Sequence, residues 1–291
     1  SGKVHIREGE EKIHAMMEDY EGVIIWDLPS QIRNKYLKYC FSHSIRCYMS
    51  PKISDIILLG TDRIHLFDTP LLMCRNQGLS MEQRAAKRVL DIIVSGLGII
   101  VSSPIMLIIA IAVKAYDGGP VFYLQDRLTY QGKEFRIRKF RSMCVDSEKN
   151  GARLASKHDS RITPVGHVLR NLHLDELPQL FNVFAGDMSL VGPRPERDII
   201  MQEYEQEIPE FHYRLKVKAG LTGYAQVYGK YNTAPYDKLT MDLMYIAHPS
   251  IIEDLKIMLA TVKILFVPES TEGVAEGTTT AMDEQNNDLV H

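Results

Sequence analysis

The chain has 291 residues, 45% of them hydrophobic and 24% charged, which is typical of a folded protein with room for more than one structural unit. A net charge of −3 and a pI near 6.4 argue against a nucleic-acid-binding surface, and no zinc-finger or RNA-binding motif is present. The four cysteines form no CxxC pair, so neither a disulfide framework nor a zinc site is indicated.

Residues 1–79 alternate short β-branched runs with helical segments. Strands are predicted at 23–26, 45–49 and 63–67, and helices at 29–41 and 54–59. This βαβ order predicts an α/β domain with a parallel sheet. No GxGxxG loop is present, so no dinucleotide cofactor is predicted.

A polar helical approach at 80–88 leads into an apolar stretch at 89–113 that carries a single charge, Asp91. About 25 apolar residues are enough to cross a bilayer core of about 30 Å. Ser103 and Pro104 lie at the middle of the stretch, where proline removes a helical hydrogen bond. Each half is then about 10 to 15 residues long, which is too short to cross alone.

Basic residues flank both ends of this stretch, with Arg84, Lys87 and Arg88 before it and Lys114 after it. The positive-inside rule places both flanks in the cytoplasm. We therefore predict a re-entrant membrane hairpin over 80–117 with its break at Ser103-Pro104. A proline-kinked spanning helix is the alternative that hydropathy alone favours.

Residues 118–266 predict a mainly helical α+β domain. Strands are expected at 121–124 and 135–140, and helices at 164–174, 176–185, 196–206, 236–247 and 250–266. Residues 267–291 are polar and predict a loosely ordered tail.

Adjacent carboxylates, Asp175 and Glu176, precede a helix signal within this domain. Pro178 is tolerated only in a first helical turn, so the helix is expected to begin near Asp175. Free N–H groups and the helix dipole there favour a carboxylate or a phosphate. Simple capping is the structural alternative. Gly186 is the expected end of the helix.

Cationic residues precede and follow this pair. Lys139 and Arg141 are candidate phosphate ligands, with a solvated strand edge as the alternative. Arg170 is close enough in sequence to pair with the carboxylates or with a phosphate. Arg194 is the strongest candidate phosphate clamp, because Pro193 and Pro195 fix φ on both sides of it.

Two further polar residues are candidates for substrate binding. Gln226 lies in the glycine-containing loop GLTGYAQVYG at 220–229 and offers amide hydrogen bonds, with a plain turn as the alternative. Asp242 is a second candidate, with a carboxylate on a helix surface as the alternative.

The segment RNLHLDELPQLFNVFAGDMSLVGPRP at 170–195, together with KFRSM at 139–143 and the 220–229 loop, closely resembles the bacterial sugar transferase family. These are monotopic polyprenyl-phosphate phosphoglycosyl transferases, and the resemblance runs from about Lys87 to the TTTAMDEQ segment near 278–285. It implies that residues 1–79 are part of a Rossmann-like domain of an N-terminally truncated long member. It also implies the re-entrant hairpin.

The resemblance implies transfer of a sugar-1-phosphate from a UDP-sugar to polyprenyl phosphate, with release of UMP, in the synthesis of a surface glycan. Asp175 would be the nucleophile of a covalent intermediate, and Glu176 and Asp175 would be the Mg²⁺ ligands, with the residues named above as substrate ligands. The implied location is the cytoplasmic face of the bacterial inner membrane, in contact with lipid. A homo-oligomer through the N-terminal domain is expected, and no nucleic acid partner.

Two other classes of protein remain open from the sequence. One is a catalytically idle membrane scaffold of a glycan assembly complex, although the presence of Asp175, Glu176, Lys139 and Arg194 disfavours it. The other is a soluble nucleotide-sugar-modifying enzyme, which the absence of a dinucleotide loop disfavours.

Overall fold

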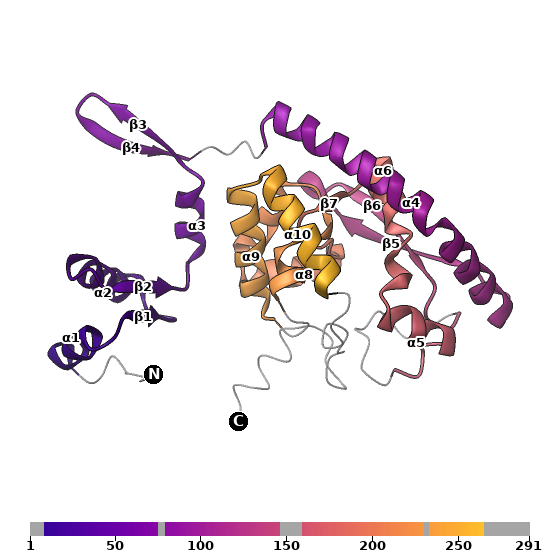
Figure 1. Cartoon of the computed structure of the whole chain (residues 1–291), viewed down its shortest axis with the longest axis horizontal. Helices are drawn as coiled ribbons and strands as arrows, with labels where there is room; N and C mark the ends of the chain where they lie inside the picture. The colour runs from indigo at the N-terminus through magenta and orange to yellow at the C-terminus, as the bar shows by residue number, and fades with distance from the viewer. Residues whose placement is uncertain (1–8, 75–78, 146–158, 230–232, 265–291) are drawn as a thin grey trace. The chain divides into compact units, whose positions relative to one another are not determined.

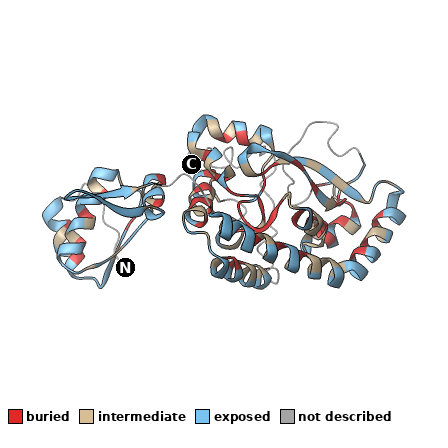
Figure 2. Cartoon of the chain, turned by 90° about the horizontal axis from the view of Figure 1, so that it is seen from above, coloured by how far each residue is buried: buried red, intermediate tan, exposed pale blue. Residues whose placement is uncertain are grey.

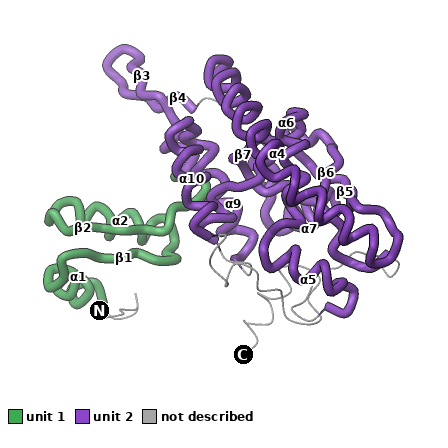
Figure 3. Tube along the Cα trace, turned by 45° about the vertical axis from the view of Figure 1, so that its right-hand side comes forward, with its two compact units in different colours: residues 1–55 green, residues 56–291 purple. Residues whose placement is uncertain are grey.

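The computed structural model describes residues 9–74, 79–145, 159–229 and 233–264. The chain divides into two compact units, residues 1–55 and 56–291 (Figure 3). Residues 267–291, where the sequence predicts a polar tail, lie outside the described residues.

The first unit is built around a parallel βαβ motif. Strands β1 and β2 pair in parallel, with Ile25 opposite Met49, and the buried side chains of α1, β1 and α2 form a small core. The βαβ order that the sequence predicts is therefore confirmed for two strands. The elements of this unit are α1 (Glu10–Glu18), β1 (Gly22–Ile25), α2 (Ser30–Ser42), β2 (Arg46–Met49) and the start of α3 (Ile53–Leu59).

The third predicted strand does not extend this parallel sheet. Strand β3 (Asp62–Leu66) pairs antiparallel with β4 (Thr69–Met73) in a separate hairpin (Figure 1). Phe67, at a positive φ of 53°, reverses the chain between the two strands. The partial Rossmann-like sheet is not confirmed, because the described residues form a parallel pair and a hairpin.

Helix α4 (Met81–Asp117) contains the whole apolar stretch. Ser80 and Gln83 form a capping box at its start, and Gly118 ends it in the left-handed conformation. The helix continues through Ser103 and Pro104, so the predicted hairpin is not confirmed. Pro104 leaves the Ile100 carbonyl without its usual N–H donor, but the Ser103 hydroxyl donates to that carbonyl at 2.8 Å.

One face of α4 packs on the second unit along most of the helix. The residues buried on this face are Lys87, Asp91, Ser95, Met106, Ile109 and Val113. Two glycines bring α4 close to the next helix of the core, since a Cβ on Gly98 would lie 3.2 Å from Leu180 and one on Gly96 would lie 3.4 Å from Phe184. Both halves of α4 thus belong to one packed body.

The opposite face of α4 is exposed, as the colouring by burial in Figure 2 shows along the helix, and its exposed residues are mostly apolar. It presents Val89, Ile92, Ile93, Leu97, Ile100, Val101, Ile105, Leu107, Ile108 and Ile111. Among the described helices, α4 alone is long and apolar enough to cross a membrane, and only 17% of its most apolar 18-residue window is buried. A helix at the centre of a soluble core would be mostly buried.

The rest of the second unit is mainly helical, as the sequence predicts, and contains two small two-stranded sheets, of which only the first in the chain is predicted from the sequence. Its strands are β5 (Phe122–Leu128), β6 (Glu134–Phe140), β7 (Ser189–Val191) and β8 (Gly220–Thr222). Its helices are α5 (Pro164–Asn171), α6 (Gln179–Ala185), α7 (Asp198–Glu207), α8 (Tyr224–Tyr228), α9 (Pro235–Ala247) and α10 (Ile251–Ile264), with 3-10 turns η2 (Tyr130–Gly132), η3 (Leu174–Glu176) and η4 (Pro209–Lys216).

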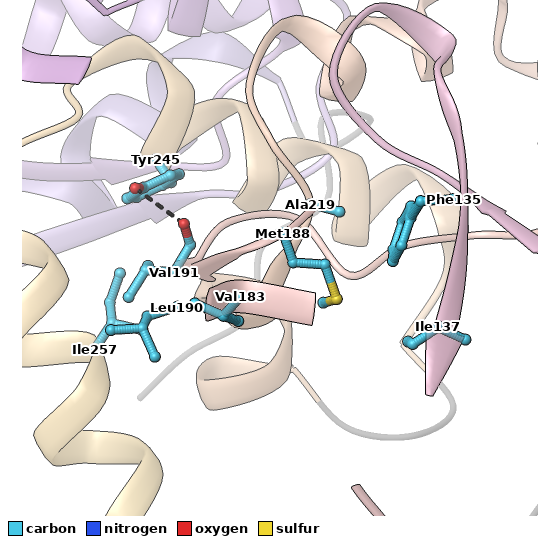
Figure 4. Close-up of a cluster of buried hydrophobic side chains, with 9 residues drawn as sticks. All are labelled: Phe135, Ile137, Val183, Met188, Leu190, Val191, Ala219, Tyr245 and Ile257. Atoms are coloured by element: carbon cyan, nitrogen blue, oxygen red, sulfur yellow. Dashed lines mark hydrogen bonds between the residues drawn. The ribbon is translucent and has the colours of Figure 1, made fainter. Parts of the chain in front are cut away.

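The core of this unit joins β6, α6, β7, α9 and α10 (Figure 4). Val183, Met188 and Ile257 are completely buried in it, and the Tyr245 hydroxyl donates to the Val191 carbonyl at 3.4 Å. Burying such side chains stabilises the unit by roughly 1.5–3 kcal/mol each. This core fixes the position of β7, which leads directly into the Pro193–Pro195 turn.

Candidate active site

Asp175 and Glu176 lie in the 3-10 turn η3 and not at the start of α6 as predicted. His173 enters the turn at a positive φ of 53°, and the Glu176 N–H donates to the His173 carbonyl at 3.3 Å. Pro178 is the N-cap of α6, so it lies just before the helix. The sequence predicts it inside the first helical turn. The pair is thus carried by a separate short turn, while α6 ends at Gly186 as predicted.

Glu176 is held between two cations from distant parts of the sequence. Lys139 Nζ, on β6, donates to its Oε1 at 2.6 Å, and Arg194 Nη2 donates to the same oxygen at 2.9 Å. Burial opposes ionisation of Glu176, but the charges of Arg194 and Lys139 outweigh it and hold its pKa well below the usual range. The same contact raises the pKa of Arg194. The two cations therefore favour the ionised form of Glu176.

The side chain of Asp175 has different surroundings from that of Glu176. Its side chain is buried, and among the described residues no hydrogen bond or ion pair engages its carboxylate. Burial raises the pKa of Asp175, while the nearby charge of Lys139 opposes this and that of Glu176 adds to it. A carboxylate without a contact partner keeps its lone pairs available for an incoming electrophile.

Two of the predicted phosphate ligands, Arg170 and Arg141, have different surroundings in the structure. Arg170 lies near the pair, since its charge acts on Asp175, and its Nε donates to the Ser142 hydroxyl at 2.8 Å. Arg141 is buried and forms a bidentate ion pair with Asp117 at the end of α4, while its Nε donates to the Pro120 carbonyl at 2.8 Å. The structure does not bring Arg141 to the carboxylate pair, because its donors are engaged in closing the α4–β5 connection.

The Pro193–Pro195 turn presents Arg194 towards Glu176. Pro193 and Pro195 are buried, whereas the Arg194 side chain is 49% exposed. A guanidinium that is anchored at one oxygen and open to solvent has donors left for a phosphate. Arg194 therefore combines a fixed backbone with an accessible cation.

Asp242 and Gln226 are not in contact with the carboxylate pair among the described residues. Asp242, on α9, is 1% exposed and its Oδ2 accepts from Arg214 Nη2 at 2.7 Å. Burial raises the pKa of Asp242 to about 6 against the opposing charge of Arg214. Both amide atoms of Gln226, on α8, are buried without a hydrogen-bond partner in the described part of the chain.

Several residues that organise the site were not singled out by the sequence. Arg214 and Arg127 hold the Pro193–Pro195 turn, Ser142 holds Arg170, and Asn182 ties α6 to β6 through the Arg136 carbonyl at 2.8 Å. The alternation of Arg214, Lys216 and Lys218 with apolar residues resembles a solvated strand edge, which conceals that Arg214 alone is buried. Only tertiary contacts distinguish it.

The residues present are compatible with Mg²⁺. No group of three His, Cys, Asp or Glu residues suited to a metal occurs among the described residues. Magnesium commonly binds through one or two carboxylates together with substrate phosphates and water. Asp175, with its unpaired carboxylate, and the adjacent Glu176 meet this requirement.

The sequence profile of the bacterial sugar transferase family matches residues 82–268, which include all of α4 except its first residue and every residue of the candidate site. The chain therefore belongs to this family, as the resemblance of its motifs indicates.

Curated relatives are named as undecaprenyl-phosphate sugar phosphotransferases. A UDP-N-acetylgalactosamine-undecaprenyl-phosphate N-acetylgalactosaminephosphotransferase of Aeromonas hydrophila is 43% identical over 182 residues, covering 62% of this chain and 43% of the relative. A UDP-glucose:undecaprenyl-phosphate glucose-1-phosphate transferase of Klebsiella pneumoniae is 38% identical over 270 residues, covering 89% and 55%. An undecaprenyl-phosphate galactose phosphotransferase of Salmonella typhimurium is 36% identical over 233 residues, covering 74% and 48%. The chain spans about half the length of these relatives.

The ion pairs of Glu176 predict a defined pH dependence of stability. Because the folded state lowers its pKa, the stability that Glu176 contributes is fully present above its unfolded pKa of about 4.3 and is lost as the pH falls through the folded value. The wild type should therefore be more stable than Glu176→Gln at neutral pH, and this difference should shrink in acid. Thermal unfolding of the two proteins between pH 3 and pH 7 measures it. A difference that stays constant over this range would contradict the assignment.

Proposed function

We propose that the protein is a phosphoglycosyl transferase that moves a sugar-1-phosphate from a UDP-sugar to polyprenyl phosphate, with release of UMP. The observation that carries this proposal is the difference between the two carboxylates of η3. Glu176 is held as an anion by Lys139 and Arg194, while Asp175 is buried beside them and its carboxylate has no hydrogen-bond or ion-pair partner among the described residues. The names of the relatives support the donor and acceptor classes.

The proposed reaction has two displacements at one phosphorus atom. An Asp175 carboxylate oxygen attacks the β-phosphorus, and the bond from this phosphorus to the bridging oxygen breaks, so that UMP leaves with the electron pair. An oxygen of polyprenyl phosphate then attacks the same phosphorus. The Asp175–phosphorus bond breaks and the carboxylate is restored.

The cations around the pair suit this chemistry. Arg194 is exposed and carries further donors, so it can bind the diphosphate while Lys139 keeps Glu176 ionised. Asp175 and Glu176 are the carboxylates that would hold Mg²⁺, which when bound neutralises negative charge on the diphosphate. Arg170 lies within electrostatic reach of Asp175 and adds a further positive charge.

We further propose that the protein lies on the cytoplasmic face of the bacterial inner membrane, with α4 in the membrane surface. The residues of α4 that pack on the rest of the second unit extend from Lys87 to Val113, a length of about 40 Å at 1.5 Å per residue. A helix that crossed the bilayer would take its packed partners into the hydrocarbon. A helix that lies along the interface buries its apolar outer face in lipid and keeps both ends on one side.

Replacement of the nucleophile is the direct test of the proposed chemistry. Asp175→Asn should lower transfer of labelled sugar phosphate from a UDP-sugar to polyprenyl phosphate by about 10³-fold or more, because an amide is a poor nucleophile towards phosphorus. Asp126→Asn is the matched control, since Asp126 is an exposed carboxylate paired with Arg136 on the outer side of β5. It should keep wild-type activity. Normal transfer by Asp175→Asn would refute the nucleophile, and no transfer by the wild type across a panel of UDP-sugars would favour an idle scaffold.

The orientation of α4 predicts the accessibility of its two ends. Single cysteines at Met81 and Tyr116, both exposed, should react with a membrane-impermeant reagent only from the cytoplasmic side. Cys74 and Cys144, which are exposed, should first be replaced by serine. Inside-out and right-side-out vesicles provide the comparison. Labelling of the two positions from opposite sides would show a spanning helix.

A further inference from the structure

Four successive carbonyls, those of the Pro193–Pro195 turn and of Glu196 after it, accept hydrogen bonds from other parts of the unit. The Gly220 N–H donates to the Pro193 carbonyl at 2.8 Å, and the Leu128 N–H donates to the Glu196 carbonyl at 3.0 Å. The two carbonyls between them accept from the buried Arg214 and the partly buried Arg127. Arg214 Nη2 donates to the Arg194 carbonyl at 3.1 Å and Arg127 Nη1 donates to the Pro195 carbonyl at 3.1 Å.

Arg214 is the centre of this arrangement. Its side chain is 4% exposed and lies over the ring of Phe211, with 4.8 Å from Cζ to the ring centroid. Its Nε and Nη2 donate to Asp242 Oδ2 at 3.1 and 2.7 Å, and Nη1 lies 3.5 Å from Glu196 Oε1. These contacts direct all three guanidinium nitrogens to protein oxygens, so Arg214 has no free edge for a substrate.

The prolines that flank Arg194 restrict its φ angles but do not fix where the turn lies. The position comes from the hydrogen bonds to the carbonyls, and the one on Arg194 itself comes from Arg214. A buried guanidinium needs a counter-charge, which Asp242 supplies from α9. The chain from Asp242 to Arg214 to the Arg194 carbonyl therefore determines where the exposed guanidinium of Arg194 is presented.

We propose that Arg214, anchored by Asp242, is a positioning residue that acts on the reaction through Arg194 alone. Asp242 then contributes to substrate binding without contacting the substrate. This inference rests on the proposed function, because it assigns Arg194 to the diphosphate of the nucleotide sugar. Lysine at position 214 retains the charge but loses the fork that joins Asp242 to the carbonyl.

A double-mutant cycle tests this role, with kcat/KM for the UDP-sugar and the affinity for UDP as the two measurements. Arg214→Lys should lower kcat/KM by about 10²-fold, because a small displacement of a substrate-binding group has an effect of this size. Arg194→Ala should lower it at least as much. The double variant should be no worse than Arg194→Ala alone, since a residue that acts through Arg194 has nothing left to position. UDP affinity should follow the same pattern.

Arg33→Lys is the matched control, because Arg33 is a buried arginine in a bidentate pair with Asp55 in the first unit, and it should leave both measurements unchanged. If Arg214→Lys does not fold, Asp242→Asn takes its place in the cycle, since it leaves the guanidinium and weakens its anchor. Losses that multiply in the double variant, or wild-type activity in Arg214→Lys, would overturn the inference. Failure of the proposed function would instead appear as absence of transfer by the wild type.

Discussion

The arrangement of the site depends on the pairing of Glu176 with Lys139 and Arg194. A largely buried carboxylate is costly unless it is paired, and here the partners come from β6 and from the Pro193–Pro195 turn. The pairing therefore draws three segments that are far apart in sequence to one point. It also leaves Asp175 as the carboxylate of the pair that has no hydrogen-bond or ion-pair partner within the described part of the chain. Two adjacent residues of the same chemical type thus acquire different properties from their surroundings.

Buried polar contacts within the second unit connect this site to helix α4, whose outer face is apolar. Asp91, on the buried face of the helix, accepts from the Leu190 N–H at 2.9 Å and from the Ser189 hydroxyl at 3.0 Å, and both of these residues belong to β7. Lys87 pairs with Asp254 and donates to the Tyr245 hydroxyl at 3.0 Å. Since β7 leads into the turn that carries Arg194, a helix with an exposed apolar face is joined through buried polar contacts to the turn that we propose to bind phosphate. This connection suits an enzyme with one soluble and one lipid-linked substrate.

The sequence predicted those features that depend on local patterns. Helices α5, α7, α9 and α10 of the second unit, the end of α6 at Gly186 and the family itself follow from periodicity, capping residues and motifs, and the structure and comparisons confirm them. Helix α8 was not predicted, because its sequence resembles a glycine-containing loop. The predicted break of the apolar helix at Pro104 is not confirmed, because the Ser103 hydroxyl donates to the carbonyl that the proline leaves without a donor and the helix continues.

Roles that depend on tertiary partners could not be predicted from sequence. Arg141 belongs to a motif that suggests phosphate binding, yet Asp117 and the Pro120 carbonyl occupy its donors. Asp242 is a candidate for substrate binding from the sequence, yet in the structure its carboxylate is buried and paired with Arg214. A lone charge in an apolar stretch usually has a buried partner, but the sequence does not identify the partner of Asp91. Its partners on β7 are nearly 100 residues away.

The central claim is that Asp175, and not Glu176, receives the phosphosugar. Incubation of the protein with a UDP-sugar in the absence of polyprenyl phosphate, followed by acid quenching and peptide mass mapping, tests it most directly. The account predicts a sugar-phosphate adduct on Asp175 that disappears when polyprenyl phosphate is added. An adduct on Glu176, or transfer without any adduct on the protein, would contradict it.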